Sequence, residues 1–238
     1  MAKGHADITD LVWFSDEAQL YLNAQVNKQH FRYRGSEKPN MYFEKPLHSK
    51  KVTVWAALSS QGIIGPFCYE DENGEIATVN SDRYLKLLKT KFVPGLRRRD
   101  IDINNMWYQQ DVAAPHTALK VLAWLEQKFG EILISLKTST AWPPHPPDLS
   151  RLDFFLWGYL KDRVYKPMPN DTEELKNAIK REIRLIGQNT CTSVVRNFRD
   201  RLDVVLQQKG RHKKDVTWII FYKTDYRVQR LSYVYKES

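Results

Sequence analysis

The chain has 238 residues, of which 42% are hydrophobic and 27% charged, and its formal net charge at neutral pH is +9. This composition excludes a disordered or low-complexity chain and predicts a globular domain with one substantial core. The positive charge favours a polyanionic partner, although a merely basic surface would give the same balance.

Cysteine usage and hydropathy narrow the class of protein further. The only two cysteines, Cys68 and Cys191, stand in unrelated sequence contexts. This argues against a disulfide framework or a zinc site and fits a reducing compartment. No apolar run is long enough to cross a membrane and no signal-peptide pattern begins the chain, so we expect no membrane partner.

The first elements in chain order are predicted strands. Residues 1–10 are polar, and we expect them to form a flexible N-terminus. Runs rich in β-branched, aromatic or alternating residues then predict strands at 11–14 (ending at Asp16), 19–34, 51–58 and 63–69. Clusters of Gly, Pro, Asn and Asp between these runs predict turns.

A helix is predicted next, at residues 81–92, because apolar residues recur there at helical spacing. Asn80 or Ser81 can cap its first turn, and Pro94-Gly95 is expected to end it.

The chain then alternates strand, helix, strand. The predicted elements are a strand at 105–110, which delivers Asp111, a helix at 117–129 with Leu119 among its inward residues, and a strand at 132–136.

The last part of the chain is predicted to be mainly helical. The prolines at 143–147 favour an extended path that places Asp148, and helices are then predicted at 149–165, 171–186 and 191–208. The stretch 216–235 is aromatic and strand-like. The order of elements predicts an α/β fold with a mixed central sheet flanked by helices.

Three aspartates stand in distinct settings. Asp16 and Asp111 each follow an apolar or aromatic run, and Asp148 opens a predicted helix. A carboxylate at the end of a core strand is costly unless it meets a cation, and three together would suit Mg²⁺ or Mn²⁺. Taken singly, an aspartate is more often a cap or turn residue, and Asp148 before Leu149 is a credible N-cap.

Short stretches around these aspartates resemble, in order, the catalytic domain of mariner-type transposases of the Tc/mariner superfamily. Among them are Phe14-Ser15-Asp16-Glu17-Ala18, Gly62-Ile63-Ile64-Gly65-Pro66, Gln109-Gln110-Asp111, Pro115-His116-Thr117-Ala118, Pro147-Asp148-Leu149 and Leu152-Asp153-Phe154-Phe155-Leu156-Trp157-Gly158. The resemblance runs from about residue 12 to about residue 212. Each stretch is weak alone, and their shared order carries the signal.

The resemblance implies a ribonuclease-H-like catalytic domain at 11–208, followed by a divergent basic and aromatic tail at 209–238. It implies that Asp16, Asp111 and Asp148 form a catalytic, metal-binding triad for two Mg²⁺ or Mn²⁺ ions, which cleaves DNA and transfers strands. DNA is then the expected partner, with a possible homodimer, no small-molecule cofactor, and the nucleus as the location.

Further residues near the triad have two interpretations each. His116 could contact a phosphate or position a ligand, or be a structural histidine at a helix start. Glu17 and Asp153 could tune the site, although a salt-bridged or surface role suits Glu17 better. Trp157 and its aromatic neighbours could stack on bases, but at helical spacing such residues are more often core.

The sequence also departs from the family pattern. The family places helix-turn-helix modules before the catalytic domain, and we expect none in the short stretch before Val12. Val112, Pro147 and Arg151 replace residue types usual beside the second and third aspartates. These departures favour, as an alternative, a decayed or domesticated DNA-binding protein without catalysis. A third possibility is a ribonuclease-H-like nuclease unrelated to transposition.

Overall fold

The computed structural model describes residues 8–23, 50–136, 138, 140–141 and 152–207. The chain divides into a compact unit Met1–Arg199 and a second unit Asp200–Ser238. Of the second unit only residues 200–207 are described, and they are helical. Asp148, the prolines before it and the tail beyond residue 207 therefore lie outside the described residues.

A six-stranded mixed sheet forms the centre of the first unit. Its strands are β1 (Val12–Tyr21), β2 (Lys51–Ser59), β3 (Gly62–Cys68), β4 (Trp107–Gln109), β5 (Leu133–Ser135) and β6 (Thr140–Ala141). Their spatial order is β3-β2-β1-β4-β5-β6. β1, β2 and β3 pair antiparallel, whereas β4 pairs parallel to β1, and β5 and β6 continue in parallel.

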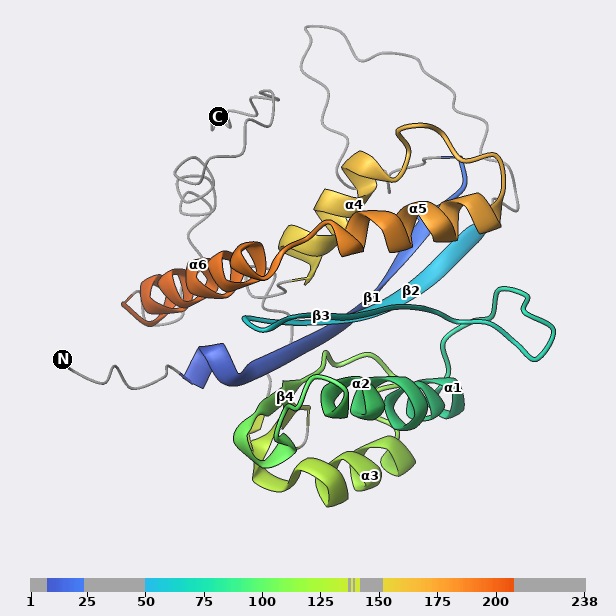
Figure 1. The fold of residues 1–238 in the computed structure, drawn as a ribbon. Helices are drawn as coiled ribbons and strands as arrows, with labels where there is room; N and C mark the ends of the chain where they lie inside the picture. The colour runs from blue at the N-terminus through green and yellow to red at the C-terminus, as the bar shows by residue number, and fades with distance from the viewer. Residues whose placement is uncertain (1–7, 24–49, 137, 139, 142–151, 208–238) are drawn as a thin grey trace, which may run out of the picture. The chain divides into compact units, whose positions relative to one another are not determined.

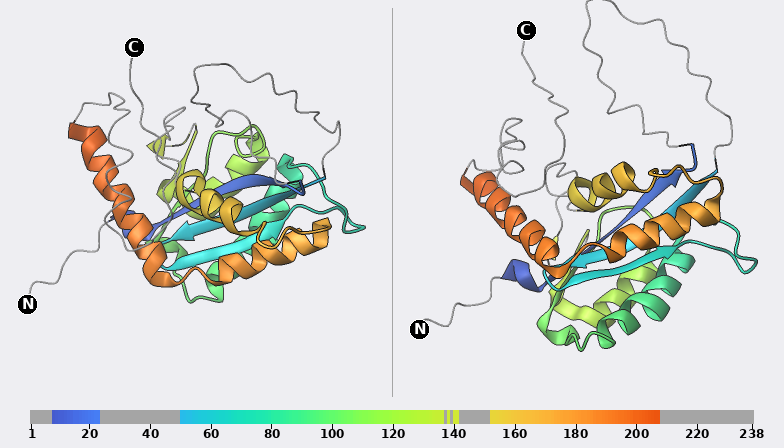
Figure 2. Two further views of the ribbon diagram at one scale, coloured as in Figure 1. Left: turned by 90° about the horizontal axis from the view of Figure 1, so that it is seen from above. Right: turned by 45° about the horizontal axis from the view of Figure 1, so that its top comes forward.

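Helices cover both faces of the sheet, which confirms the predicted α/β layering (Figures 1 and 2). One layer holds α1 (Ser81–Leu87), the π-helical segment η3 (Leu88–Phe92), α2 (Val93–Arg97) and α3 (Leu119–Phe129). The other holds the π-helical segment η6 (Leu152–Trp157), α4 (Gly158–Arg163), α5 (Thr172–Arg184) and the start of α6 (Gln188–Gln207). Short 3₁₀ turns lie at Ile8–Leu11, Ile103–Asn105 and Gly130–Ile132.

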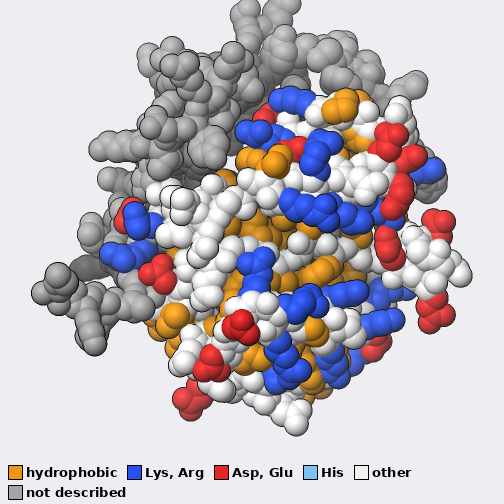
Figure 3. Space-filling view, in the orientation of Figure 1, with side chains coloured by type: hydrophobic (Ala, Val, Ile, Leu, Met, Phe, Trp, Pro, Cys, Tyr) orange, Lys and Arg blue, Asp and Glu red, His pale blue; other side chains and the backbone are white. Residues whose placement is uncertain are grey.

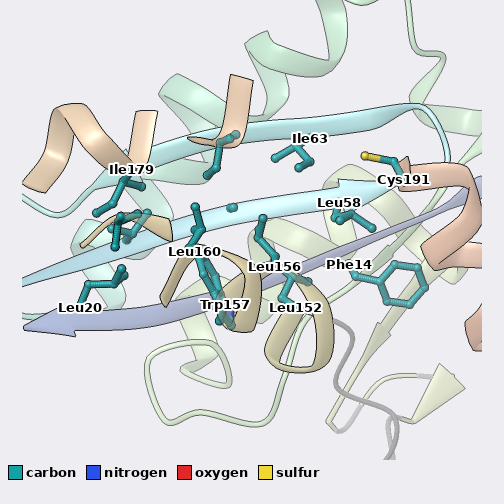
Figure 4. Close-up of a cluster of buried hydrophobic side chains, with 14 of the residues drawn as sticks. Phe14, Leu20, Leu58, Ile63, Leu152, Leu156, Trp157, Leu160, Ile179 and Cys191 are labelled. Carbon is teal, nitrogen blue, oxygen red and sulfur yellow. The ribbon is translucent and has the colours of Figure 1, made fainter. Parts of the chain in front are cut away.

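Each face of the sheet has its own apolar core. Along β1 successive side chains alternate between faces, so Phe14 packs with the α4–α6 layer and Trp13 with the α1–α3 layer. Figure 4 shows the first of these clusters, in which Trp157 lies beside Leu156 and Leu160 near β1. Strand β2 is buried along nearly its whole length because helices cover it from both sides.

The predicted cap at Asn80 is confirmed, and the structure shows a second side-chain cap at Asp171. The Asn80 side chain accepts a hydrogen bond from the backbone N–H of Arg83 at 2.9 Å, at the start of α1. Asp171 does the same for Glu174 at 2.8 Å, at the start of α5. Each cap satisfies an N–H that the first helical turn leaves without a partner.

Three sequence predictions are wrong in detail. Strand β1 does not end at Asp16 but runs on to Tyr21. The helix predicted to end at Pro94 continues through α2, because the π-helical segment before it resets the hydrogen-bond register and places Pro94 in a first turn, where no N–H is needed. Leu119, predicted to face inward, is 86% exposed.

None of the described helices is both long and apolar enough to cross a membrane.

Candidate functional site

Of the three predicted aspartates, Asp16 lies within β1 and Asp111 lies just past the end of the neighbouring strand β4. β1 and β4 run parallel, with Phe14 opposite Gln109. Two residues beyond these positions stand Asp16, still within β1, and Asp111, just past the end of β4. Within β1, Asp16 pairs with Ala56 of β2, and the pairing of β1 with β4 ends two residues before it, at Phe14.

Asp16 is held by a donor from the α4–α6 layer. The indole N–H of Trp157 donates to Asp16 Oδ2 at 3.0 Å. The backbone N–H of Glu17 donates to Asp16 Oδ1 at 2.8 Å. Trp157 is 1% exposed and ends the π-helical segment η6, so the apolar core fixes the donor.

Asp111 is held from the opposite layer. Its Oδ1 accepts the backbone N–H of Ala113 at 3.0 Å and is hydrogen-bonded to Nδ1 of His116. Burial alone would raise the pKa of Asp111, but the hydrogen bond and charge of His116 and the Ala113 N–H lower it below its ordinary value. Asp111 is therefore an anion at neutral pH.

His116 bridges two carboxylates while being only 1% exposed. Its Nε2 lies 3.1 Å from Glu17 Oε1, and its ring stacks on Tyr84 with 4.0 Å between centroids. Burial favours the neutral ring, but hydrogen bonds and charges from Asp111 and Glu17 raise the pKa of His116 to about 10. Both ring nitrogens therefore carry protons at neutral pH and donate, one to each carboxylate.

Buried polar contacts fix the loop that carries Asp111 and His116. Gln110 Nε2 donates to the His116 carbonyl at 3.0 Å and to Ser135 Oγ at 2.9 Å, and its Oε1 accepts from Tyr84 at 2.7 Å. The Tyr69 hydroxyl donates to Glu17 Oε1 at 2.7 Å. The loop is thereby tied to β5, α1 and β1 at once.

Of the six residues predicted for the site, the structure brings Asp111, His116 and Glu17 into contact. Asp16 precedes Glu17 on β1, and its side chain accepts from Trp157 of the other layer. Asp148 lies outside the described residues, and for Asp153 only the backbone, within η6, is described. Glu17 forms a salt bridge with His116, in agreement with one of its two interpretations. His116 is buried, as a structural histidine would be.

The ligand types suit a hard divalent cation, since carboxylate oxygens are its preferred ligands and Asp111 is held as an anion. Within the described ranges no group of three or more His, Cys, Asp or Glu side chains is arranged to hold a metal ion. The third carboxylate that the resemblance implies belongs to a segment that is not described.

Sequence reasoning missed the contacts of Trp157, Tyr69, Tyr84 and Gln110. Trp157 was expected in the core, and it is, but its bond to Asp16 joins residues 141 positions apart. No local pattern reports such a pairing. The one signal for these contacts in the sequence was the amide residue Gln110, which stands directly before an aspartate at the end of a predicted apolar strand.

Exposed cations gather on the α1–α3 layer. Figure 3 shows Lys and Arg side chains over the region where α1, α2 and α3 lie in Figure 1. Along the segment from α1 to the end of α2, the exposed cations without a salt bridge to any described residue are Lys86, Lys89, Lys91, Arg97 and Arg98. Arg99 instead donates to the carbonyls of Gln61 and Ile63 at the β2–β3 turn.

Comparison with known proteins gives a likeness in fold. No family model and no curated protein matches the sequence. Among solved structures, the "Mos1 transposase paired-end complex with left transposon end" is 20% identical, with a TM-score of 0.61 over 86% of this chain and 56% of that chain. The "mariner Mos1 paired end complex with Mg" has a TM-score of 0.65 at 18% identity, covering 87% of this chain and 58% of that one.

The "Mos1 transposase catalytic domain and Raltegravir with Mn" is 15% identical, with a TM-score of 0.62, and covers 87% of this chain and 86% of that chain. This chain thus spans little more than half of the chains in the paired-end complexes but most of the catalytic-domain chain. At these identities the likeness shows the ribonuclease-H-like fold, which confirms the predicted fold class.

Proposed function

We propose that this chain is a transposase catalytic core of the mariner type, which cleaves DNA phosphodiester bonds and transfers strands with divalent metal ions. The observation that carries the proposal is the position of Asp16 on β1 and of Asp111 just past β4, each two residues beyond the paired residues Phe14 and Gln109. The solved structures of similar fold are Mos1 transposase structures, some with Mg or Mn in their titles. The ordered sequence stretches support the same assignment.

In this proposal Asp16, Asp111 and Asp148 hold Mg²⁺ or Mn²⁺, with two ions per site. When bound, such ions lower the pKa of the attacking hydroxyl and stabilise the leaving oxygen. Asp16 would be one of the ligands, with its carboxylate oriented by the indole N–H of Trp157. His116 keeps Asp111 ionised, and a carboxylate must be ionised to bind a cation.

Duplex DNA is the proposed substrate and partner, in keeping with the net charge of +9. Action in the nucleus and as a homodimer are parts of the same proposal that rest on the family resemblance alone.

Nicking of supercoiled plasmid tests the proposal. Purified protein is incubated with Mg²⁺ or Mn²⁺ beside an Asp111→Asn variant. We expect metal-dependent nicking by the wild type and a loss of at least about 100-fold in the variant, because a ligand and its charge are removed while the shape is kept. Equal nicking by both proteins would contradict the assignment.

One observation favours a second candidate, a transposase-derived protein that binds DNA without cutting it. In the described part of the chain Asp111 is engaged by His116 and belongs to no three-ligand group. DNA binding without nicking in either metal would support this candidate. Cutting of RNA–DNA hybrids without strand transfer would support a ribonuclease-H-like nuclease instead.

A further inference from the structure

We propose that Trp157 and His116 are positioning residues, each orienting one metal-binding carboxylate from an opposite face of the sheet, with Glu17 acting on Asp111 through His116. The inference rests on the proposed function. It assigns the orientation of the metal-binding carboxylates to Trp157, His116 and Glu17. Carboxylates that bind metals are commonly held by outer donors, and losing such a donor costs about 10- to 100-fold in metal affinity or activity.

A tryptophan can be buried in this protein without a hydrogen-bond partner for its indole N–H, so burial alone does not account for the contact between Trp157 and Asp16. Trp13 and Trp55 are fully buried too, and their indole N–H groups have no hydrogen-bond partner among the described residues. Trp157 differs because its N–H meets Asp16 Oδ2 at 3.0 Å. The core therefore tolerates an unpaired indole, and the geometry at Trp157 points to orientation of Asp16.

Glu17 reaches Asp111 only indirectly. It follows Asp16 on β1, so its side chain projects from the opposite face, into the α1–α3 layer. There its Oε1 lies 3.1 Å from His116 Nε2 and accepts from the Tyr69 hydroxyl at 2.7 Å. His116, sandwiched between Glu17 and Asp111 and stacked on Tyr84, has one orientation that satisfies both ring nitrogens.

Two positions can thus be altered without touching a proposed ligand. Trp157→Phe removes the N–H and keeps an aromatic ring in the core. Tyr69→Phe removes the hydroxyl that fixes Glu17. The chain offers a matched control for each: Trp13→Phe alters a buried tryptophan whose N–H has no partner, and Tyr165→Phe removes a hydroxyl that donates to the Tyr21 carbonyl.

The measurement is Mn²⁺ affinity of the full chain by calorimetry, together with the melting temperature without metal. We expect Trp157→Phe to weaken Mn²⁺ binding about 10- to 100-fold and Tyr69→Phe less, each relative to its control. Nicking by Trp157→Phe should recover at high Mn²⁺, whereas nicking by Asp111→Asn should not. A merely structural role would lower the metal-free melting temperature and leave Mn²⁺ affinity equal to that of the control, which would overturn the inference.

A double-mutant cycle tests the route through His116. If Glu17 acts only through His116, Glu17→Gln should weaken Mn²⁺ binding in the wild type and add little in a His116→Asn background. Additive losses would overturn this route. Failure of the proposed function has a separate signature: the wild type would bind no more Mn²⁺ than Asp111→Asn does, and the inference would then fall with it.

Discussion

At the scale of residues, the two carboxylates at the β1–β4 junction differ in how they are held. Asp16 accepts from an uncharged indole, and Asp111 from an imidazolium that a second carboxylate also engages. A buried cation between two anions is favourable only while all three stay charged. The pH dependence of stability should therefore report on His116.

Because the pKa of His116 is raised from 6.5 to about 10 on folding, its stabilising contribution is complete below pH 6.5 and is lost as the pH rises through 10. We expect the free energy of unfolding of the metal-free wild type, relative to that of His116→Asn, to fall steadily between these pH values. Denaturant unfolding at pH 6, 8 and 10 measures this difference. A constant difference would mean that His116 is neutral in the folded protein.

At the scale of elements, much of the fold was predictable from local pattern. β-Branched runs predicted β2 and β3, and helical spacing with capping residues predicted α1 and α5. Strand β1 was cut short because Asp16 and Glu17 look like a strand end. They continue the strand because contacts distant in sequence, from Trp157, Tyr69 and His116, satisfy their carboxylates.

Helix α2 approaches the sheet closely at one glycine. A Cβ added to Gly95 would lie 2.8 Å from Cγ2 of buried Ile64. We expect Gly95→Ala to destabilise the protein by about 1–3 kcal/mol through overpacking. Gly158→Ala, also helical but with nothing within 4 Å of the new Cβ, should be neutral or stabilising by up to about 1 kcal/mol. Urea unfolding measures the free energy of unfolding of both variants. Equal changes for Gly95→Ala and Gly158→Ala would contradict the close packing at Gly95.

At the scale of the whole molecule, the site was only partly predictable. The ordered stretches singled out Asp111, Glu17 and His116, which are in contact in the fold, and Asp16, which is the neighbour of Glu17 on β1. The bonds that link Asp16 to Trp157 and Glu17 to His116 could not be read from local pattern, since these residues are 141 and 99 positions apart. For Asp148 the sequence remains the only guide.

The distribution of charge makes a separate prediction. If the exposed cations from α1 to α2 contact DNA phosphates, replacing Lys86, Lys91 and Arg97 with Gln should weaken binding. It should also reduce the slope of log affinity against log salt by up to about 0.9 per lost contact. A control triple, Lys161, Lys166 and Arg184 to Gln, removes equal charge from the α4–α6 layer. Fluorescence anisotropy with duplex DNA measures the affinity of both triple variants. Equal losses of affinity would indicate an effect of total charge and not of the cations from α1 to α2.

The position of Asp16 within a strand has a consequence for motion. Its backbone pairs with Ala56 of β2, and β1 is also paired with β4 up to Phe14, so amides near Asp16 should be among the slowest to exchange with deuterium. Asp111 stands just beyond β4, on a loop that side chains hold in place. Any adjustment of the spacing between the two carboxylates must therefore come from the Asp111 side, with Asp16 as the stationary reference.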